Sequence, residues 1–149
     1  MQDFVHLHVH TQYSLLDGQA SVARLVDKAM QNGMKGIAVT DHGNMFGIKE
    51  FTNYVNKKNS GPKGEVKDLK KRIAGIEAGT IECADKEAEI AACKAKIVEA
   101  ENKLFKPVIG CEMYVARRTM DLKEGKPDQS GYHLIVLAKN EKGYHNLIK

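Results

Sequence analysis

Residues 36–44 have the sequence Gly-Ile-Ala-Val-Thr-Asp-His-Gly-Asn, and this stretch is the most informative about the fold. The almost wholly apolar run from Gly36 to Thr40 is typical of a short strand that a parallel sheet buries on both faces. Polar residues begin abruptly at Asp41 and His42. In α/β proteins ligands bind beyond the carboxyl ends of such strands, so we expect a functional site at this point of the chain.

Hydrophobic periodicity extends this pattern to both sides. Alternating or apolar segments predict strands at residues 5–9, 36–40, 107–115 and 132–138. Helical spacing predicts helices at residues 22–30, 48–55 and 143–149, the first with Ser21 as its N-cap and Gly33 as its stop. Strands that alternate with helices predict parallel pairing and an α/β fold. Because the last helix is cut off by the chain end, we expect a truncated unit.

Residues 61–104 differ from the rest of the chain, since they are rich in Ala, Lys and Glu. Apolar residues recur every seven positions from Leu69 to Leu104, but this one thin stripe is too narrow for a self-standing coiled coil. We interpret the segment as an inserted pair of helices, folded back on itself or docked on the main body, with Thr80 as a candidate cap of the second helix. A decoration of the fold is favoured over a partner-binding arm.

Length and composition indicate one globular domain. The chain has 149 residues, of which 42% are hydrophobic and 28% charged, which excludes disorder, fibrous repeats and a disulfide scaffold. No apolar run approaches the roughly 20 residues that cross a bilayer, and no secretory signal begins the sequence, so we expect no membrane partner.

The cysteines and the charged residues give weaker evidence about location and binding partners. The three cysteines, at positions 83, 93 and 111, contain no Cys-x-x-Cys pair and cannot all be paired, which favours a reducing, cytoplasmic location. A basic cluster (Arg117, Arg118, Lys123 and Lys126) interrupts an otherwise balanced chain with a net charge of +4. It is either a solvated surface or a patch that contacts phosphate.

The histidines at the N-terminus predict a metal site. His8 and His10 are two positions apart on a predicted strand, so both rings point to one side and can bind a single divalent cation at about 2.0–2.1 Å. His6 shares that face, one layer deeper. A single histidine is ordinarily a satisfied core residue, but three on one face without a shared partner would be costly. His42 is a further candidate ligand. Asp41 either accepts the second N–H of a metal-bound histidine or caps the following helix.

Two later strands carry further candidates. Glu112 is a lone glutamate in an otherwise apolar strand, where a carboxylate costs several kcal/mol unless it is paired or bound to a cation. His133 leads into the apolar run of the last predicted strand. Since nearly every predicted strand carries a histidine or an acidic residue, we predict a convergent multi-metal site. Cys111 faces away from Glu112 and is interpreted as a packing residue, and His145 as a surface residue.

These segments together resemble the PHP (polymerase and histidinol phosphatase) domain family. The motifs are His8-Val9-His10-Thr11, Tyr13-Ser14-Leu15-Leu16-Asp17-Gly18, Thr40-Asp41-His42-Gly43-Asn44-Met45, Gly110-Cys111-Glu112 and Tyr132-His133-Leu134. The opening run is similar, more narrowly, to the N-terminal PHP domain of the C-family bacterial replicative polymerases, the DNA polymerase III alpha subunits. The resemblance covers residues 1–60 and 105–149. We therefore expect residues 1–149 to be the N-terminal part of a PHP domain, with residues 61–104 as a helical insertion.

The resemblance implies an incomplete, distorted seven-stranded β/α barrel of TIM-like form. Such a barrel holds up to three divalent metal ions, zinc or manganese, at the carboxyl ends of its strands. The ligands that it implies in this sequence are His8, His10, Asp17, His42, Glu112 and His133. The later ligands of the family pattern would lie beyond Lys149, so we expect partial metal occupancy in this chain.

The resemblance also implies a function in DNA replication. The parent enzyme would be a DNA polymerase whose PHP domain is a metal-dependent phosphoesterase, acting as a 3′–5′ proofreading exonuclease or a pyrophosphatase. DNA and other replicase subunits are the implied partners through the full-length polymerase, while this chain lacks the polymerase active site. Self-association is also open. The alternatives are a structural and interaction module with vestigial metals, or a stand-alone PHP phosphatase, against which the Tyr-Ser-Leu-Leu-Asp-Gly continuation argues.

Overall fold

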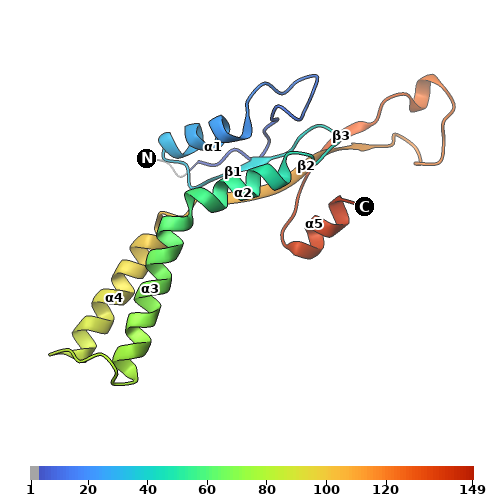
Figure 1. Cartoon of the computed structure of the whole chain (residues 1–149). Helices are drawn as coiled ribbons and strands as arrows, with labels where there is room; N and C mark the ends of the chain where they lie inside the picture. Colours follow the sequence, from blue (N-terminus) through green and yellow to red (C-terminus); the bar gives the residue numbers. More distant parts are fainter. Residues whose placement is uncertain (1–3) are drawn as a thin grey trace. The chain divides into compact units, whose positions relative to one another are not determined.

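The computed structural model describes residues 4–149, which divide into two compact units (Figure 1). The sheet unit comprises the chain up to Val55 together with Lys106–Lys149, and the helical unit comprises Asn56–Phe105. Within residues 4–149 there are five α-helices and three strands, and all three strands lie in the sheet unit. The α/β class predicted from the sequence is confirmed.

The sheet has the strand order β1-β2-β3, with β1 at Gly36–Val39, β2 at Lys106–Val115 and β3 at Tyr132–Leu137. β1 pairs with β2 in parallel, with Val39 opposite Ile109. Every residue of β1 is buried, as the apolar run predicted. The carboxyl end of β1 therefore lies beside the middle of β2.

The pairing of β2 with β3 corrects one prediction. These strands are antiparallel, with Glu112 opposite Ile135, whereas the alternation of strands and helices predicted parallel pairing throughout. The connection, residues 116–131, contains only the 3-10 turn Lys126–Asp128. A parallel partner would need a crossover to the other end of the sheet, usually through an α-helix, and this connection contains no α-helix, which fits the antiparallel hairpin.

The N-terminal segment is also different from the prediction. Residues 5–9 form no regular strand, although they run beside β1 and accept two backbone hydrogen bonds, from Ala38 to His6 (2.8 Å) and from Thr40 to Val9 (2.9 Å). Three residue steps on this segment thus match two on β1. The extra residue breaks the alternation as a bulge does, which leaves Leu7 half exposed and places His6 at the surface rather than a layer deeper.

Three helices belong wholly or largely to the sheet unit: α1 at Val22–Gln31, α2 at Ile48–Lys58 and α5 at Glu141–Leu147. They bury apolar faces that include Val22, Val26 and Ala29 from α1, and Ile48, Phe51 and Val55 from α2. α1 ends as predicted, because Gly33 has a φ of 76° and its N–H donates to the carbonyl of Met30. α1 packs on β1 and α5 on β2.

The helical unit contains α3 (Ser60–Glu77) and α4 (Lys86–Asn102), which pack against each other. Asp85 caps α4 by accepting a hydrogen bond from the N–H of Ala88, so the candidate cap Thr80 was the wrong residue. The hydroxyl of Thr80 instead donates to the carbonyl of Gly75. Few side chains are buried here, and no helix of the described chain is long and apolar enough to cross a membrane.

Asn59 holds the two ends of the helical pair together. Its side-chain amide donates to the carbonyl of Phe105 (2.8 Å) and accepts from the N–H of the same residue (2.9 Å). Asn59 is 5% exposed and Phe105 3% exposed, so this contact is shielded from water. The chain therefore enters and leaves the helical pair at almost the same point.

Deletion of the helical pair tests whether residues 61–104 are an insertion. We expect replacement of residues 61–104 by a short Gly/Ser linker to leave the sheet unit folded, because Asn59 and Phe105 already meet without it. Cooperative thermal unfolding, followed by circular dichroism, is the measurement. Loss of the cooperative transition in the deleted chain would contradict the prediction.

The β2–β3 connection is tied by the cations that the sequence grouped as a basic cluster. Arg118 forms an ion pair with Asp128 at 2.5 Å and another with Glu124 at 3.0 Å. Arg117 donates to the hydroxyl of Ser130 and lies 5.5 Å from the centre of the Tyr132 ring. Two of the four basic residues thus hold the loop's own conformation.

The Asp128 ion pair predicts an acid-sensitive loop. Hydrogen bonds from Arg118 and from the Glu124 backbone lower the pKa of Asp128 below its ordinary value of 3.8. The stabilisation is therefore present above the ordinary pKa and is lost as the pH falls through the lowered one. We expect the amide resonance of Glu124 to titrate by NMR with a midpoint below 3.8, and not to titrate in Asp128→Asn. A midpoint at or above that value would contradict the ion pair.

Candidate metal centre

The structure brings five of the six predicted ligands to one place, and the sixth contacts two of them. The five come from four segments that are far apart in the sequence: the N-terminal segment, the carboxyl end of β1, the middle of β2 and the start of β3. They are His8, His10, His42, Glu112 and His133. Strand pairing explains the meeting, because His42 pairs with Glu112 beyond the end of β1. His133 is the diagonal neighbour of Glu112 across the β2–β3 hairpin.

Glu112 lies at the centre of the cluster and is 5% exposed. One carboxylate oxygen, Oε2, lies 2.6 Å from Nε2 of His10 and 3.5 Å from Nε2 of His8. The other oxygen, Oε1, lies 2.5 Å from Nδ1 of His133. Burial raises the pKa of Glu112, but hydrogen bonds with His10 and His133 outweigh it and leave the pKa below its ordinary value.

The cluster divides into two groups that share Glu112. His8, His10 and Glu112 form one group, and His42, Glu112 and His133 form the other, with the ligand atoms of each group within 4.8 Å of one another. Imidazole nitrogens and carboxylate oxygens are the donors that zinc and similar transition-metal ions accept. The donor set and spacing thus fit a divalent ion in each group.

The surroundings of His42 test independently whether the site fits a metal ion. Its Nε2 is buried and has no hydrogen-bond partner, whereas Nδ1 lies 3.0 Å from Oδ2 of Asp17. The ring of Tyr114 stacks on the imidazole, with centroids 4.9 Å apart and planes inclined by 24°. An unpaired buried nitrogen is costly unless a ligand completes it, so the ring fits a metal-bound histidine whose other nitrogen is held by a carboxylate.

Asp17 lies beside both groups rather than within either. Oδ1 of its carboxylate is 3.1 Å from Nδ1 of His10, and Oδ2 is 3.0 Å from Nδ1 of His42. The hydroxyl of Ser14 and the His42 ring hold the pKa of Asp17 at about 2, so the carboxylate is ionised at neutral pH. The resemblance implied that Asp17 is a ligand. In the structure its carboxylate lies beside one histidine of each group, and its role as a ligand stays a prediction.

Asp41 does not take either of its predicted roles directly. Its buried carboxylate accepts hydrogen bonds from the backbone N–H (2.6 Å) and the hydroxyl (2.8 Å) of Thr11. It neither contacts a histidine ring through these bonds nor caps α2, which begins at Ile48. Asp41 instead fixes the residue that follows His10.

Three hydroxyl residues of the site were missed from the sequence: Thr11, Ser14 and Thr40. Thr40 lies 2.9 Å from Nδ1 of His8 and accepts from the N–H of Val9, while Ser14 accepts from the N–H of His42 and donates to Asp17. All three are at most 1% exposed. Each lies within three positions of a predicted ligand and inside a motif of the family resemblance, which are the signals that could have identified them.

The remaining candidates lie outside the groups. Cys111 is buried on the opposite face of β2 and donates to the carbonyls of Asp41 and Asn44; burial raises the pKa of its thiol, which fits a packing role. His145 is exposed and lies 3.7 Å from Glu141 on α5. His6 contacts the ring of Phe4.

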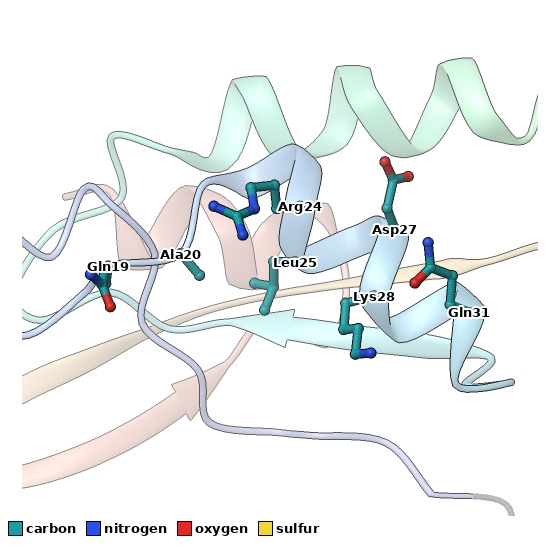
Figure 2. A pocket seen from close by; sticks show the side chains of 7 residues that line it. All are labelled: Gln19, Ala20, Arg24, Leu25, Asp27, Lys28 and Gln31. Carbon is teal, nitrogen blue, oxygen red and sulfur yellow. The ribbon is translucent and has the colours of Figure 1, made fainter.

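A hollow beside α1 is separate from this cluster (Figure 2). It has a volume of about 760 Å³ and is lined by Ala20, Leu25 and polar side chains, among them Arg24, Lys28 and Gln31. None of the predicted ligands lines it.

Comparison with protein families agrees with the geometry. The model of the PHP domain matches residues 6–149, which includes every residue of the cluster. The chain belongs to the PHP domain family. The resemblance inferred from the sequence motifs is therefore confirmed.

Several similar proteins are DNA polymerase III alpha subunits. The PHP domain is 38% identical to the DNA polymerase III subunit alpha of Treponema pallidum and 39% identical to that of Borreliella burgdorferi, over 97% and 98% of its length. The subunit alpha of Aquifex aeolicus is 32% identical over 99% of its length. The chain spans about 9% of the length of each of these relatives.

Removing the Thr11 hydroxyl tests how Asp41 supports the site. We expect Thr11→Val to lower the free energy of unfolding by about 1–3 kcal/mol, because a buried carboxylate oxygen loses its donor while the side-chain shape is kept. Thr119→Val, at an exposed position, is the matched control and should leave stability unchanged. Urea denaturation measures both, and equal midpoints for the two variants would contradict the role of Asp41.

Proposed function

We propose that this PHP domain is a metal-dependent phosphoesterase with two divalent ions that share Glu112. The observation that carries the proposal is that the two carboxylate oxygens of Glu112 contact different histidines. Oε2 faces His8 and His10, and Oε1 faces His133. A buried carboxylate with separate histidine groups on its two oxygens is what a bridging ligand requires.

The residues that would hold the ions are the two groups themselves: His8 and His10 with Glu112, and His42 and His133 with Glu112. Zinc or manganese suits this mixture of imidazole and carboxylate donors. When bound, such ions lower the pKa of a coordinated water and neutralise charge on phosphoryl oxygens.

The protein's own residues prepare the donors. The Thr40 hydroxyl bonds to His8, and Asp17 bonds to His10 and His42, so three rings are oriented by groups behind them. Glu112 and Asp17 are both ionised at neutral pH, since their pKa values are lowered. The site therefore carries two fixed negative charges, which compensate part of the charge of two ions.

The similarity to polymerase subunits supports a place in DNA replication. We infer that the chain forms part of a DNA polymerase III alpha subunit, with DNA and other replicase subunits as partners of the parent protein. A 3′–5′ proofreading exonuclease or a pyrophosphatase is the activity that we propose for the domain. The incomplete, distorted β/α barrel remains a prediction from the resemblance.

One observation favours a second candidate, a structural module. The histidine and carboxylate contacts join the N-terminal segment, β1, β2 and β3, so ions at the same positions would also brace the sheet unit. The two candidates differ in one outcome: ions that only brace the fold raise its thermal stability without any hydrolysis.

Metal analysis with a hydrolysis assay tests the proposal. We expect manganese-loaded chain to bind two ions and to hydrolyse a phosphodiester such as bis(p-nitrophenyl) phosphate. Glu112→Gln should lose both ions and at least about 10²-fold in rate, because it removes the shared ligand. Elemental analysis and the release of p-nitrophenol are the measurements.

The matched control is His145→Ala, which removes an exposed histidine outside the cluster and should change neither ions nor rate. His8→Ala should lose the ion of its own group. Full metal content in Glu112→Gln would contradict the bridging role, and ion-dependent stability without hydrolysis in the parent chain would favour the structural module.

A further inference from the structure

A pocket of about 340 Å³ adjoins the histidine cluster. Two of its wall residues, Asp17 and His42, also belong to the cluster or orient it. The other walls are mainly apolar and aromatic: Tyr13, Leu15, Leu16, Phe46 and Tyr114. A ligand in this pocket would thus lie next to the candidate metal centre.

Four of the large apolar side chains that line the pocket are exposed to water. Leu15 is 86% exposed, Leu16 101%, Phe46 76% and Tyr114 57%. These are four of the twelve exposed large apolar side chains among the described residues. Scattered apolar residues are ordinary on a surface, but a group of them around one hollow marks a binding site.

Two of the aromatic rings are held in place. Tyr13 donates its hydroxyl to Glu50 at 2.6 Å, and its ring passes so close to Gly47 that a Cβ there would lie 2.7 Å from the ring. Tyr114 stacks on His42 and meets the edge of His133, with centroids 5.0 Å apart. Rings fixed in this way offer a contact surface without a large loss of side-chain entropy on binding.

Charge excludes one class of occupant. No lysine or arginine lines the pocket, and Asp17 adds a negative charge to its wall. A pyrophosphate or a second phosphate would therefore be repelled there and would leave the apolar walls uncovered. A neutral, flat, apolar-faced group suits both the charge and the walls.

We propose that this pocket, named here the base pocket, receives the nucleobase of a terminal unpaired nucleotide whose phosphate lies at the metal centre. The inference rests on the proposed phosphoesterase function and names its substrate class: a single-stranded or frayed nucleic-acid end, not pyrophosphate. Bases stack on aromatic side chains with little regard to sequence. A base inside a duplex is already stacked and could enter only after unpairing.

The polar groups of the base pocket agree with weak base discrimination. The side-chain amide of Asn44 donates to the carbonyls of Tyr13 and His42, and its oxygen accepts from the N–H of Phe46. The hydroxyl of Ser14 donates to Asp17. These groups are used to build the wall. Recognition is therefore by stacking and apolar contact.

Binding measurements on the manganese-loaded chain test the inference. The probes are deoxyadenosine 5′-monophosphate and inorganic pyrophosphate, followed by isothermal titration calorimetry. We expect Phe46→Ala to weaken the nucleotide by about tenfold and to leave pyrophosphate unchanged, because only the nucleotide has a base to stack. Phe46→Tyr keeps the ring and should keep the affinity.

Phe4→Ala is the matched control, since it removes another exposed phenylalanine outside the pocket. Three results would overturn the inference: unchanged nucleotide affinity in both Phe46→Ala and Tyr114→Leu, an equal loss of pyrophosphate affinity, or a change from dimer to monomer in Phe46→Ala with nucleotide affinity intact. The last would identify the patch as a contact between copies of the chain.

A separate measurement tests the proposed phosphoesterase function independently of the base pocket. A titration with manganese alone shows whether the ions bind. If they do not, the phosphoesterase proposal fails, and deoxyadenosine, which has no phosphate, still tests the base pocket through the same Phe46 variants.

Discussion

A carboxylate buried in the middle of a sheet is the constraint on which the site depends. Glu112 lies on the central strand, with β1 on one side and β3 on the other, and its backbone bonds to Asp41 and Gly43. Both neighbours fix that backbone, and the residue is only 5% exposed. A charge so placed must be paired or bound to cations, and the surrounding histidines answer that requirement.

The strand pairing and the N-terminal segment of the sheet unit place those histidines beside Glu112. The parallel pairing of β1 and β2 carries His42 to Glu112, and the antiparallel hairpin carries His133 to the other carboxylate oxygen. The irregular N-terminal segment adds His8 and His10 from beside β1. Buried hydroxyls and Asp17 then orient the rings, so the cluster has an inner set of donors and an outer set that holds them.

Much of this could be predicted from local patterns. The apolar run of residues 36–40, the stop at Gly33 and the placement of polar residues after a buried strand depend on near neighbours in the chain, and the structure confirms them. The misplaced features depend on contacts between distant segments. An extra residue against β1 moved His6 to the surface, and a connection without a crossover helix reversed β3. Asp41 was expected either to accept from a metal-bound histidine or to cap a helix, whereas its carboxylate accepts from Thr11.

The sequence by itself determined the α/β class, the family and which side chains are candidate metal ligands, because residue type and short-range periodicity are properties of the chain alone. Only the tertiary structure decided how those side chains are shared. It set Glu112 between two histidine groups, left Nε2 of His42 unpaired and gathered apolar residues from two loops and a strand around one pocket. Distances between segments more than a hundred residues apart follow from strand register and packing, which no local pattern specifies.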